Sequence, residues 1–257
     1  MKIGFILIIL LSPLLAYGED IKGLQPFQPF GVFSTFSTES LHRRELGISI
    51  NLERSKAPDF YRLTLQGAYG ISDNKEIHLN MPYFFKYEQD IYGFEDLNIG
   101  FKHRLIEEGR LNPSFAYIIA LSPGLGRSDF STNGRIGGGL IVSKKIGPFK
   151  GHANLLFYQP FKSGLNREYL LNLGAELAVT HSSKVLAELI GRKNYYINRL
   201  DLLEWRLGFR QEAIENVFTT IGAGFDIKDR KPDYRFLFSI TYIIPTERQE
   251  IKRIYEN

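Results

Sequence analysis

The segment 203–210 reads Leu203-Glu204-Trp205-Arg206-Leu207-Gly208-Phe209-Arg210. Apolar side chains occupy its odd positions, and charged residues or glycine occupy its even positions. Successive side chains of an extended strand point to opposite faces. The segment therefore predicts a strand with one apolar face and one charged face, lying between two different environments.

The same period of two continues from residue 45 to residue 245. It is clear in Leu46-Gly47-Ile48-Ser49-Ile50-Asn51-Leu52-Glu53 and in Tyr234-Arg235-Phe236-Leu237-Phe238-Ser239-Ile240-Thr241-Tyr242. We predict about twelve strands, each with roughly the length that a tilted membrane strand needs. Their expected ranges are 45–55, 59–71, 76–86, 94–106, 112–121, 133–145, 149–159, 168–180, 184–193, 202–212, 217–227 and 234–245.

The connections between these ranges are alternately tight and long, with exceptions at 56–58 and 228–233. In bacterial barrels the tight turns face the periplasm and the long loops face outward. Aromatic residues fall at both ends of the strands, as in membrane girdles. They are Tyr61, Phe85, Tyr169 and Tyr234 at the loop end, and Tyr69, Phe115 and Tyr242 at the turn end. These features favour an all-β, antiparallel transmembrane β-barrel over a soluble β-sandwich, whose strands also alternate.

Composition supports an exported chain without disulfides. The chain has 257 residues, 14% aromatic residues and no cysteine, which excludes a disulfide framework and a lipid anchor on cysteine. The net charge of +4 is mild and the basic residues are spread along the chain, so nucleic-acid binding is not expected. No stretch after residue 18 has about 18 consecutive apolar residues, so a membrane span must consist of strands.

The N-terminus resembles a secretory signal peptide over residues 1–18. A positive Met1-Lys2 precedes an apolar run that ends at Leu15, and Ala16-Tyr17-Gly18 offers small residues for cleavage. We expect a mature chain from Glu19, delivered to the outer membrane. The barrel is expected over 45–245, with a charged periplasmic tail over 246–257.

Residues 19–44 fit no amphipathic strand. Phe27, Phe30, Phe33 and Phe36 recur at every third position, and Pro26 and Pro29 discourage a central strand. Three arrangements stay open: a periplasmic arm, a segment folded into the lumen, and an extra strand.

The charged positions of the strands are expected to line the lumen. Arg or Lys facing lipid at the bilayer midplane costs about 2–4 kcal/mol, so these side chains face inward if the barrel is correct. The predicted lining is Arg62, Lys102, Arg104, Arg135, Glu176, Glu188, Arg192, Glu204, Arg206, Arg210 and Arg235. Glu53 and Asp226 share that face. The charges can hold a wet channel or pair with one another and fill the lumen, and both remain open.

One region resembles the outer-membrane family named for the meta-pathway of phenol degradation. The resemblance covers roughly residues 60–160. Its main motif is Gly93-Phe94-Glu95-Asp96-Leu97-Asn98-Ile99-Gly100-Phe101-Lys102-His103-Arg104, and it is preceded by Tyr69-Gly70-Ile71-Ser72-Asp73-Asn74 and Met81-Pro82-Tyr83. The later motifs are Pro113-Ser114-Phe115-Ala116 and Val142-Ser143-Lys144-Lys145 with Gly147-Pro148. Leu121-Ser122-Pro123-Gly124 is a variant of that family's Leu-Pro-x-Gly run. The resemblance implies an outer-membrane barrel that transports small, often aromatic, compounds.

No motif predicts catalysis. The five histidines show no metal-ligand spacing, and no glycine-rich loop follows a buried strand as in a nucleotide site, so no metal or cofactor is expected. His181-Ser182-Ser183 matches the His and Ser spacing of outer-membrane phospholipases, but it falls in a predicted tight turn, where serine is common.

The sequence thus predicts an outer-membrane barrel that acts as a passive channel for small solutes. The basic excess among the predicted lining residues favours anions or the faces of aromatic rings. The expected partners are the lipid bilayer, the barrel-assembly machinery and a small-molecule solute. Two alternatives remain: a closed structural barrel without transport, and a soluble periplasmic β-sandwich.

Overall fold

The computed structural model describes residues 23–246, except 57, 89, 194–199 and 228–233. The predicted signal peptide and all but the first residue of the predicted tail lie outside this range. Within the described residues, no helix has the length and hydropathy of a membrane span.

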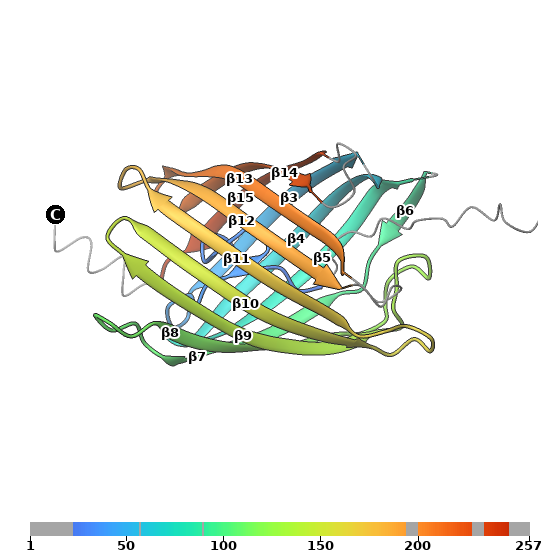
Figure 1. Cartoon of the computed structure of the whole chain (residues 1–257), viewed down its shortest axis with the longest axis horizontal. Helices are drawn as coiled ribbons and strands as arrows, with labels where there is room; N and C mark the ends of the chain where they lie inside the picture. Colours follow the sequence, from blue (N-terminus) through green and yellow to red (C-terminus); the bar gives the residue numbers. More distant parts are fainter. Residues whose placement is uncertain (1–22, 57, 89, 194–199, 228–233, 247–257) are drawn as a thin grey trace, which may run out of the picture.

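Antiparallel strands wind around a single closed wall (Figure 1). They are β3 (Leu46–Lys56), β4 (Asp59–Ser72), β5 (Lys75–Tyr87), β6 (Ile91–Phe94), β7 (Asn98–Ile106), β8 (Ser114–Ser122), β9 (Arg135–Ile146), β10 (Phe149–Pro160), β11 (Glu168–Ala178), β12 (Ser183–Lys193), β13 (Leu200–Ile214), β14 (Val217–Asp226) and β15 (Tyr234–Ile244). In the described part of the chain they form a twelve-stranded barrel, in which β6 and β7 are two pieces of one strand.

Each strand pairs with the next along the chain, and the first pairs with the last. β3 pairs with β4 on one edge and with β15 on the other, for example through Leu52 opposite Phe238. This pairing joins the two ends of the sheet and satisfies the backbone groups that an open edge would leave bare. The predicted β-barrel is therefore confirmed.

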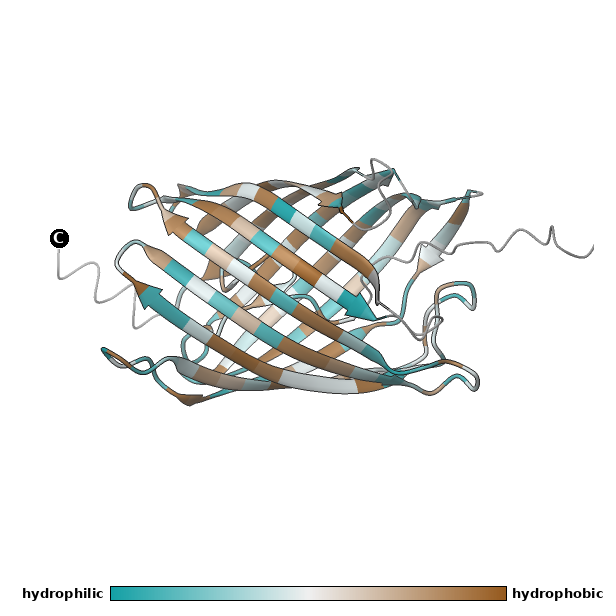
Figure 2. Cartoon of the chain, viewed as in Figure 1, coloured by the Kyte–Doolittle hydropathy of each residue, from teal (hydrophilic) through white to brown (hydrophobic). Residues whose placement is uncertain are grey.

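The alternation in the sequence becomes an apolar outside and a polar inside. Ile48 and Ile50 are 50% and 47% exposed on the outer surface, whereas Ser49 between them is 1% exposed. Figure 2 shows the same alternation along the other strands. A soluble sandwich would bury the apolar faces against each other, so that alternative is wrong.

Tight turns and longer loops gather at opposite ends of the wall. Turns such as 73–74 and 147–148 define the turn end, and connections such as 123–134 and 161–167 define the loop end. Gly147 and Asn216 lie in two-residue turns with φ of 59° and 60°, the left-handed conformation that such hairpin turns favour.

One predicted strand, 94–106, is wrong as a continuous element. Residues 95–97 leave the sheet and separate β6 from β7. At this interruption the Asp96 carboxylate accepts hydrogen bonds from the connection 123–134, which lies much later in the chain.

Residues 23–41 lie within the barrel and contain a small hairpin of β1 (Gly31–Val32) and β2 (Thr35–Phe36). Figure 1 shows this blue segment inside the wall. We call residues 23–41 the inner segment. Phe27, Val32, Phe36 and Leu41 are at most 1% exposed. Of the three arrangements left open by the sequence, the described residues adopt the one in the lumen.

Candidate functional site: the barrel lumen

The structure places the predicted lining residues on the inward face, with one exception. Those that are buried are Arg62, Lys102, Arg135, Glu176, Glu188, Arg192, Glu204, Arg206, Arg210 and Arg235. Arg104 instead lies near the turn end, where its guanidinium donates hydrogen bonds to Asp73 O and to Glu107. Its position near the end of β7 brings it to the rim and away from the middle of the lumen.

Seven of the inward charges form one continuous chain of alternating sign. The contacts run in order through Glu95, Arg62, Glu53, Arg235, Glu204, Arg206 and Glu188. Five of the six N–O separations are 3.3 Å for Arg62–Glu95, 2.6 Å for Arg235–Glu53, 3.2 Å for Arg235–Glu204, 2.6 Å for Arg206–Glu204 and 3.5 Å for Arg206–Glu188. Strand pairing builds this chain, because Glu53 stands opposite Arg62 and Glu188 stands opposite Arg206.

Other charges pair in smaller groups. Lys102 Nζ lies 2.6 Å from Glu76, which also lies 2.7 Å from His78. Glu176 accepts from Lys184 at 2.6 Å and lies 3.6 Å from Arg210. These pairs satisfy charges that could not be buried alone.

Several inward acids are absent from the predicted lining. Glu76, Glu95 and Glu168 are buried in the lumen, and each lies within 4.0 Å of a buried base. Glu76 could have been found, because it precedes the outward Ile77 in the alternating pattern of β5. With these acids counted, the predicted basic excess of the lining is largely compensated.

The inner segment is held mainly through its backbone. Ser34 N donates to Glu188 at 2.8 Å, and Leu41 N donates to Glu76 at 2.8 Å. In the opposite sense, Arg210 donates to Pro29 O at 2.8 Å, and Lys102 donates to Ser37 O at 3.1 Å. Several predicted lining residues thus bind a peptide in this structure.

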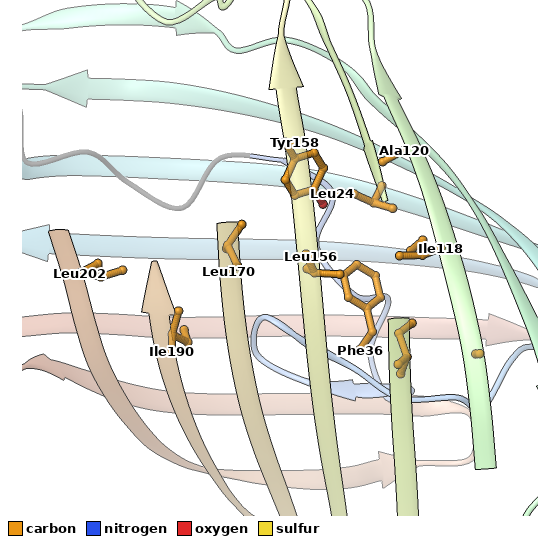
Figure 3. Close-up of a cluster of buried hydrophobic side chains, with 11 residues drawn as sticks. Leu24, Phe36, Ile118, Ala120, Leu156, Tyr158, Leu170, Ile190 and Leu202 are labelled. Carbon is orange, nitrogen blue, oxygen red and sulfur yellow. The ribbon is translucent and has the colours of Figure 1, made fainter. Parts of the chain in front are cut away.

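Apolar contacts fix the same segment on one side of the lumen. Leu24 and Phe36 join a cluster of inward side chains that includes Ile118, Leu156 and Tyr158 (Figure 3). Leu156 and Tyr158 break the polar pattern of their strand in the sequence. The structure explains the exception, because these two side chains receive the inner segment.

Glycines in the wall form notches for the bulky side chains of the segment. A Cβ at Gly47 would lie 2.2 Å from Phe27 Cζ, and a Cβ at Gly222 would lie 2.4 Å from Phe33 Cε1. A Cβ at Gly100 would likewise lie 2.1 Å from Leu24 Cδ2. Phe27 and Phe33 thus enter different notches, and Phe36 joins the cluster of Leu156, so these rings do not form one strand face.

A cavity remains between the inner segment and the wall formed by β3, β4, β13, β14 and β15. Its volume is about 60 Å³, and its lining includes Gln28, Ser34, Glu53, Arg62 and Arg206. One water needs roughly 10–15 Å³ on this scale, so the cavity has room for a few waters.

The motif His181-Ser182-Ser183, which matches the spacing of the phospholipases, lies at the turn end and not in the middle of the lumen. Ser182 is exposed in the turn 179–182, where its hydroxyl accepts a hydrogen bond from Gln211 Nε2 at 2.9 Å. Among the described residues, no three His, Cys, Asp or Glu side chains group as a metal site.

Comparison with known proteins places the fold in one class. No protein-family model matches the chain, and no curated protein matches it. It is similar to the crystal structure of an outer membrane channel from Pseudomonas putida F1, with a TM-score of 0.61 and 11% identity over 80% of this chain and 98% of that one. The KdgM porin has a TM-score of 0.58 and 12% identity, and the NanC porin has 0.58 and 7%; each match covers 76% of this chain and 98% of the porin.

The chain therefore has the fold of outer-membrane β-barrel channels and porins. At these identities the likeness shows the fold alone. The finer resemblance to the family of the meta-pathway of phenol degradation stays a prediction from the residues quoted above.

Proposed function

We propose that this chain is an outer-membrane channel for small solutes, in which the inner segment restricts the axial path. The observation that carries the proposal is the charged inward face inside a wall whose outside is apolar. An interior built from ions and amides can exchange its contacts with water and solute, whereas a dry apolar core cannot.

The exposed side chains support a location in lipid. Leu207 and Phe209 alternate with the buried Arg206 and Arg210, and they are 46% and 38% exposed on the outer surface. Apolar side chains cover the outer surface along every long strand, far more than a soluble monomer exposes as one patch. The predicted signal peptide supports export to that membrane.

The inner segment supports a restricted path. Its partners lie on strands around much of the wall, from Glu76 on β5 and Lys102 on β7 to Asn154 on β10 and Arg210 on β13. The cavity beside this segment holds only a few waters, so we propose that conduction of larger solutes requires the segment to move.

Pairing of the charges bears on selectivity. Arg206 lies between Glu204 and Glu188, and Arg210 lies near Glu176. When the segment moves, Arg210 loses its contacts with Pro29 O and Gly31 O and faces the path. We propose that the open state has a weak preference for anions or for electron-rich aromatic solutes, the class that the family resemblance implies.

A closed structural barrel is the second candidate, and the occupied lumen is the observation that favours it. Recording in planar bilayers separates the two candidates. The full mature chain, shown to be folded by its heat-modifiable mobility, should give discrete conductance steps. The closed barrel would be favoured if the folded protein gave no conductance. The same absence of conductance would then be expected in variants whose inner segment is bound more weakly to the wall.

A further inference from the structure

The barrel wall has a gap in its hydrogen bonding near the loop end. β5 pairs with β7 as far as Asn80 opposite Asn98, and it then pairs with β6. β8 pairs with β7 but not with β6, so the second edge of β6 meets no strand in the described residues. Figure 1 shows β6 at the loop end of the wall, next to β5.

The connection 123–134 closes this gap mainly through side chains. Asp96 Oδ1 accepts from Gly126 N at 3.0 Å and from Ser131 Oγ at 2.7 Å. Asp96 Oδ2 accepts from Thr132 N at 3.0 Å and from Thr132 Oγ1 at 3.3 Å. Arg127 N donates to Phe94 O at 2.9 Å, which ties the connection to the free edge of β6.

Gly126 allows this close approach. A Cβ at Gly126 would lie 2.6 Å from both Asp96 N and Glu95 C, so a larger residue could not seat the connection against the interrupted strand. The closure is therefore a specific fit around Asp96 and differs from the ladder of backbone bonds that joins the other strands.

The inner side of the gap is aromatic. Phe130, carried by the same connection, lies with its ring centre 4.7 Å from that of Phe84 and 5.5 Å from that of Tyr87. Phe60 completes the cluster, 5.4 Å from Phe84. All these rings face the interior, where the rest of this end carries ions such as Arg62 and Glu95.

The outer side of the gap is apolar too. Tyr92 and Phe94 on β6 are 60% and 49% exposed, and Leu125 in the connection is 74% exposed. Phe85 on the neighbouring strand β5 is 57% exposed, so the apolar outer surface of the barrel extends as far as the gap. An apolar molecule thus finds apolar surface on both sides of a closure that one connection provides.

We infer that the gap between β6 and β8 is a lateral portal through which small apolar or aromatic molecules pass between the membrane and the lumen. The connection 123–134 closes this portal, and the hydrogen bonds of the Asp96 carboxylate hold the connection in place. Phe130 fills the opening from inside. This inference rests on the proposed function, because it requires a barrel in the membrane. Opening between two fully paired strands would break a run of backbone hydrogen bonds in lipid, whereas opening here releases chiefly the bonds of one carboxylate.

The test uses cells that display the full chain and the dye N-phenyl-1-naphthylamine, which fluoresces once it passes the polar cell surface into lipid. Asp96→Ala should raise the rate of dye entry several-fold over the wild type. Asp90→Ala is the matched control. Asp90 also lies at the loop end of the barrel, where it contacts Lys86 at 3.8 Å and does not belong to the contacts described for the connection 123–134. Equal rates for the two variants would overturn the portal.

A cross-link gives the opposite change. The chain has no cysteine, so Phe94→Cys with Arg127→Cys introduces one pair, which a short bifunctional thiol reagent can bridge across the gap. Bridging should abolish dye entry through the protein, and cleavage of the bridge should restore it. Phe157→Cys with Tyr169→Cys, directly opposite each other on β10 and β11, is the control pair across a fully paired seam. Entry that persists in the bridged 94–127 protein would contradict the portal.

Conductance of the same proteins in planar bilayers separates the two proposals. Suppose that the conductance steps are unchanged and that neither Asp96→Ala nor the cross-link alters the rate of dye entry. That result would reject the portal and leave the proposed channel unaffected. Absence of conductance in every folded variant would reject the channel itself.

Discussion

Asn154 holds the backbone of Phe36 with both atoms of its side-chain amide. Phe36 N donates to Asn154 Oδ1 at 2.6 Å, and Asn154 Nδ2 donates to Phe36 O at 2.9 Å. A strand neighbour would make the same pair of bonds, so one side chain of the wall substitutes for a strand. The inner segment is thus bound in the lumen as an extended peptide ligand would be.

Asn154→Ala should loosen the inner segment. Loss of two hydrogen bonds worth about 0.5–1.5 kcal/mol each should raise the population of the displaced segment by roughly 5- to 150-fold. The measurement is the rate at which a water-soluble maleimide labels Cys introduced at the buried Ser40. Asn74→Ala removes hydrogen bonds at the turn 73–74 and should leave the labelling rate unchanged. Equal rates for both variants would argue against this anchor.

Gly47→Ala should act on the same segment through packing. The new methyl group would occupy the position of the Phe27 ring, and overpacking of this kind costs about 1–3 kcal/mol. We expect faster labelling at position 40, and we expect Phe27→Ala to reverse part of the effect in the double variant. Gly67→Ala is the control, because within the described part of the chain its Cβ would meet only a backbone oxygen, at 4.0 Å. A double variant that behaves like Gly47→Ala alone would show that Phe27 is not the contact that matters.

Arg235→Ala should destabilise the barrel. Arg235 joins Glu53 to Glu204 in the buried chain of charges, and removal of one partner from such a pair costs about 3–5 kcal/mol. The urea midpoint for unfolding from lipid vesicles should therefore fall. Arg110 is exposed in the connection 107–113, so Arg110→Ala should change stability by no more than about 0.5 kcal/mol. Identical midpoints for the two variants would mean that the chain of charges does not stabilise the wall.

Arg206→Glu combined with Arg210→Glu should shift ion selectivity toward cations. Both guanidiniums face the lumen and contact the inner segment, so they border the path once the segment moves. The reversal potential across a salt gradient measures the change, in the Asn154→Ala background, where we expect more frequent opening. Arg110→Glu provides the matched change of charge outside the lumen. An unchanged reversal potential would place the ion path away from these two residues.

The sequence was sufficient for the wall because every strand faces two different environments. Alternation in segments such as 203–210 placed Arg206 and Arg210 inward without any tertiary information. It could not predict the break at 95–97, because Asp96 leaves the sheet to bind groups about 30 residues later in the chain. Such a contact leaves no local period.

Local sequence patterns could not predict the position of the inner segment either. Phe27 and Phe33 each occupy a notch that a glycine on a distant strand provides. The apolar Leu156 and Tyr158 on a polar face were a signal that something apolar enters the lumen, and Leu24 and Phe36 supply it. The acids missing from the predicted lining, such as Glu76, were likewise needed to balance bases already assigned to that face.

Conductance with the inner segment covalently fixed decides whether residues 23–41 restrict the axial path. A Cβ at Gly174 would lie 3.0 Å from Thr35 Cβ, close to the separation of about 3.5–4.5 Å in disulfides, so Thr35→Cys with Gly174→Cys can fasten the segment to β11. Gly174→Cys alone serves as the control. We predict that the oxidised protein is silent in planar bilayers and that the same molecules conduct after reduction. Conductance steps of equal size and frequency in the oxidised and reduced protein would contradict an axial path restricted by residues 23–41.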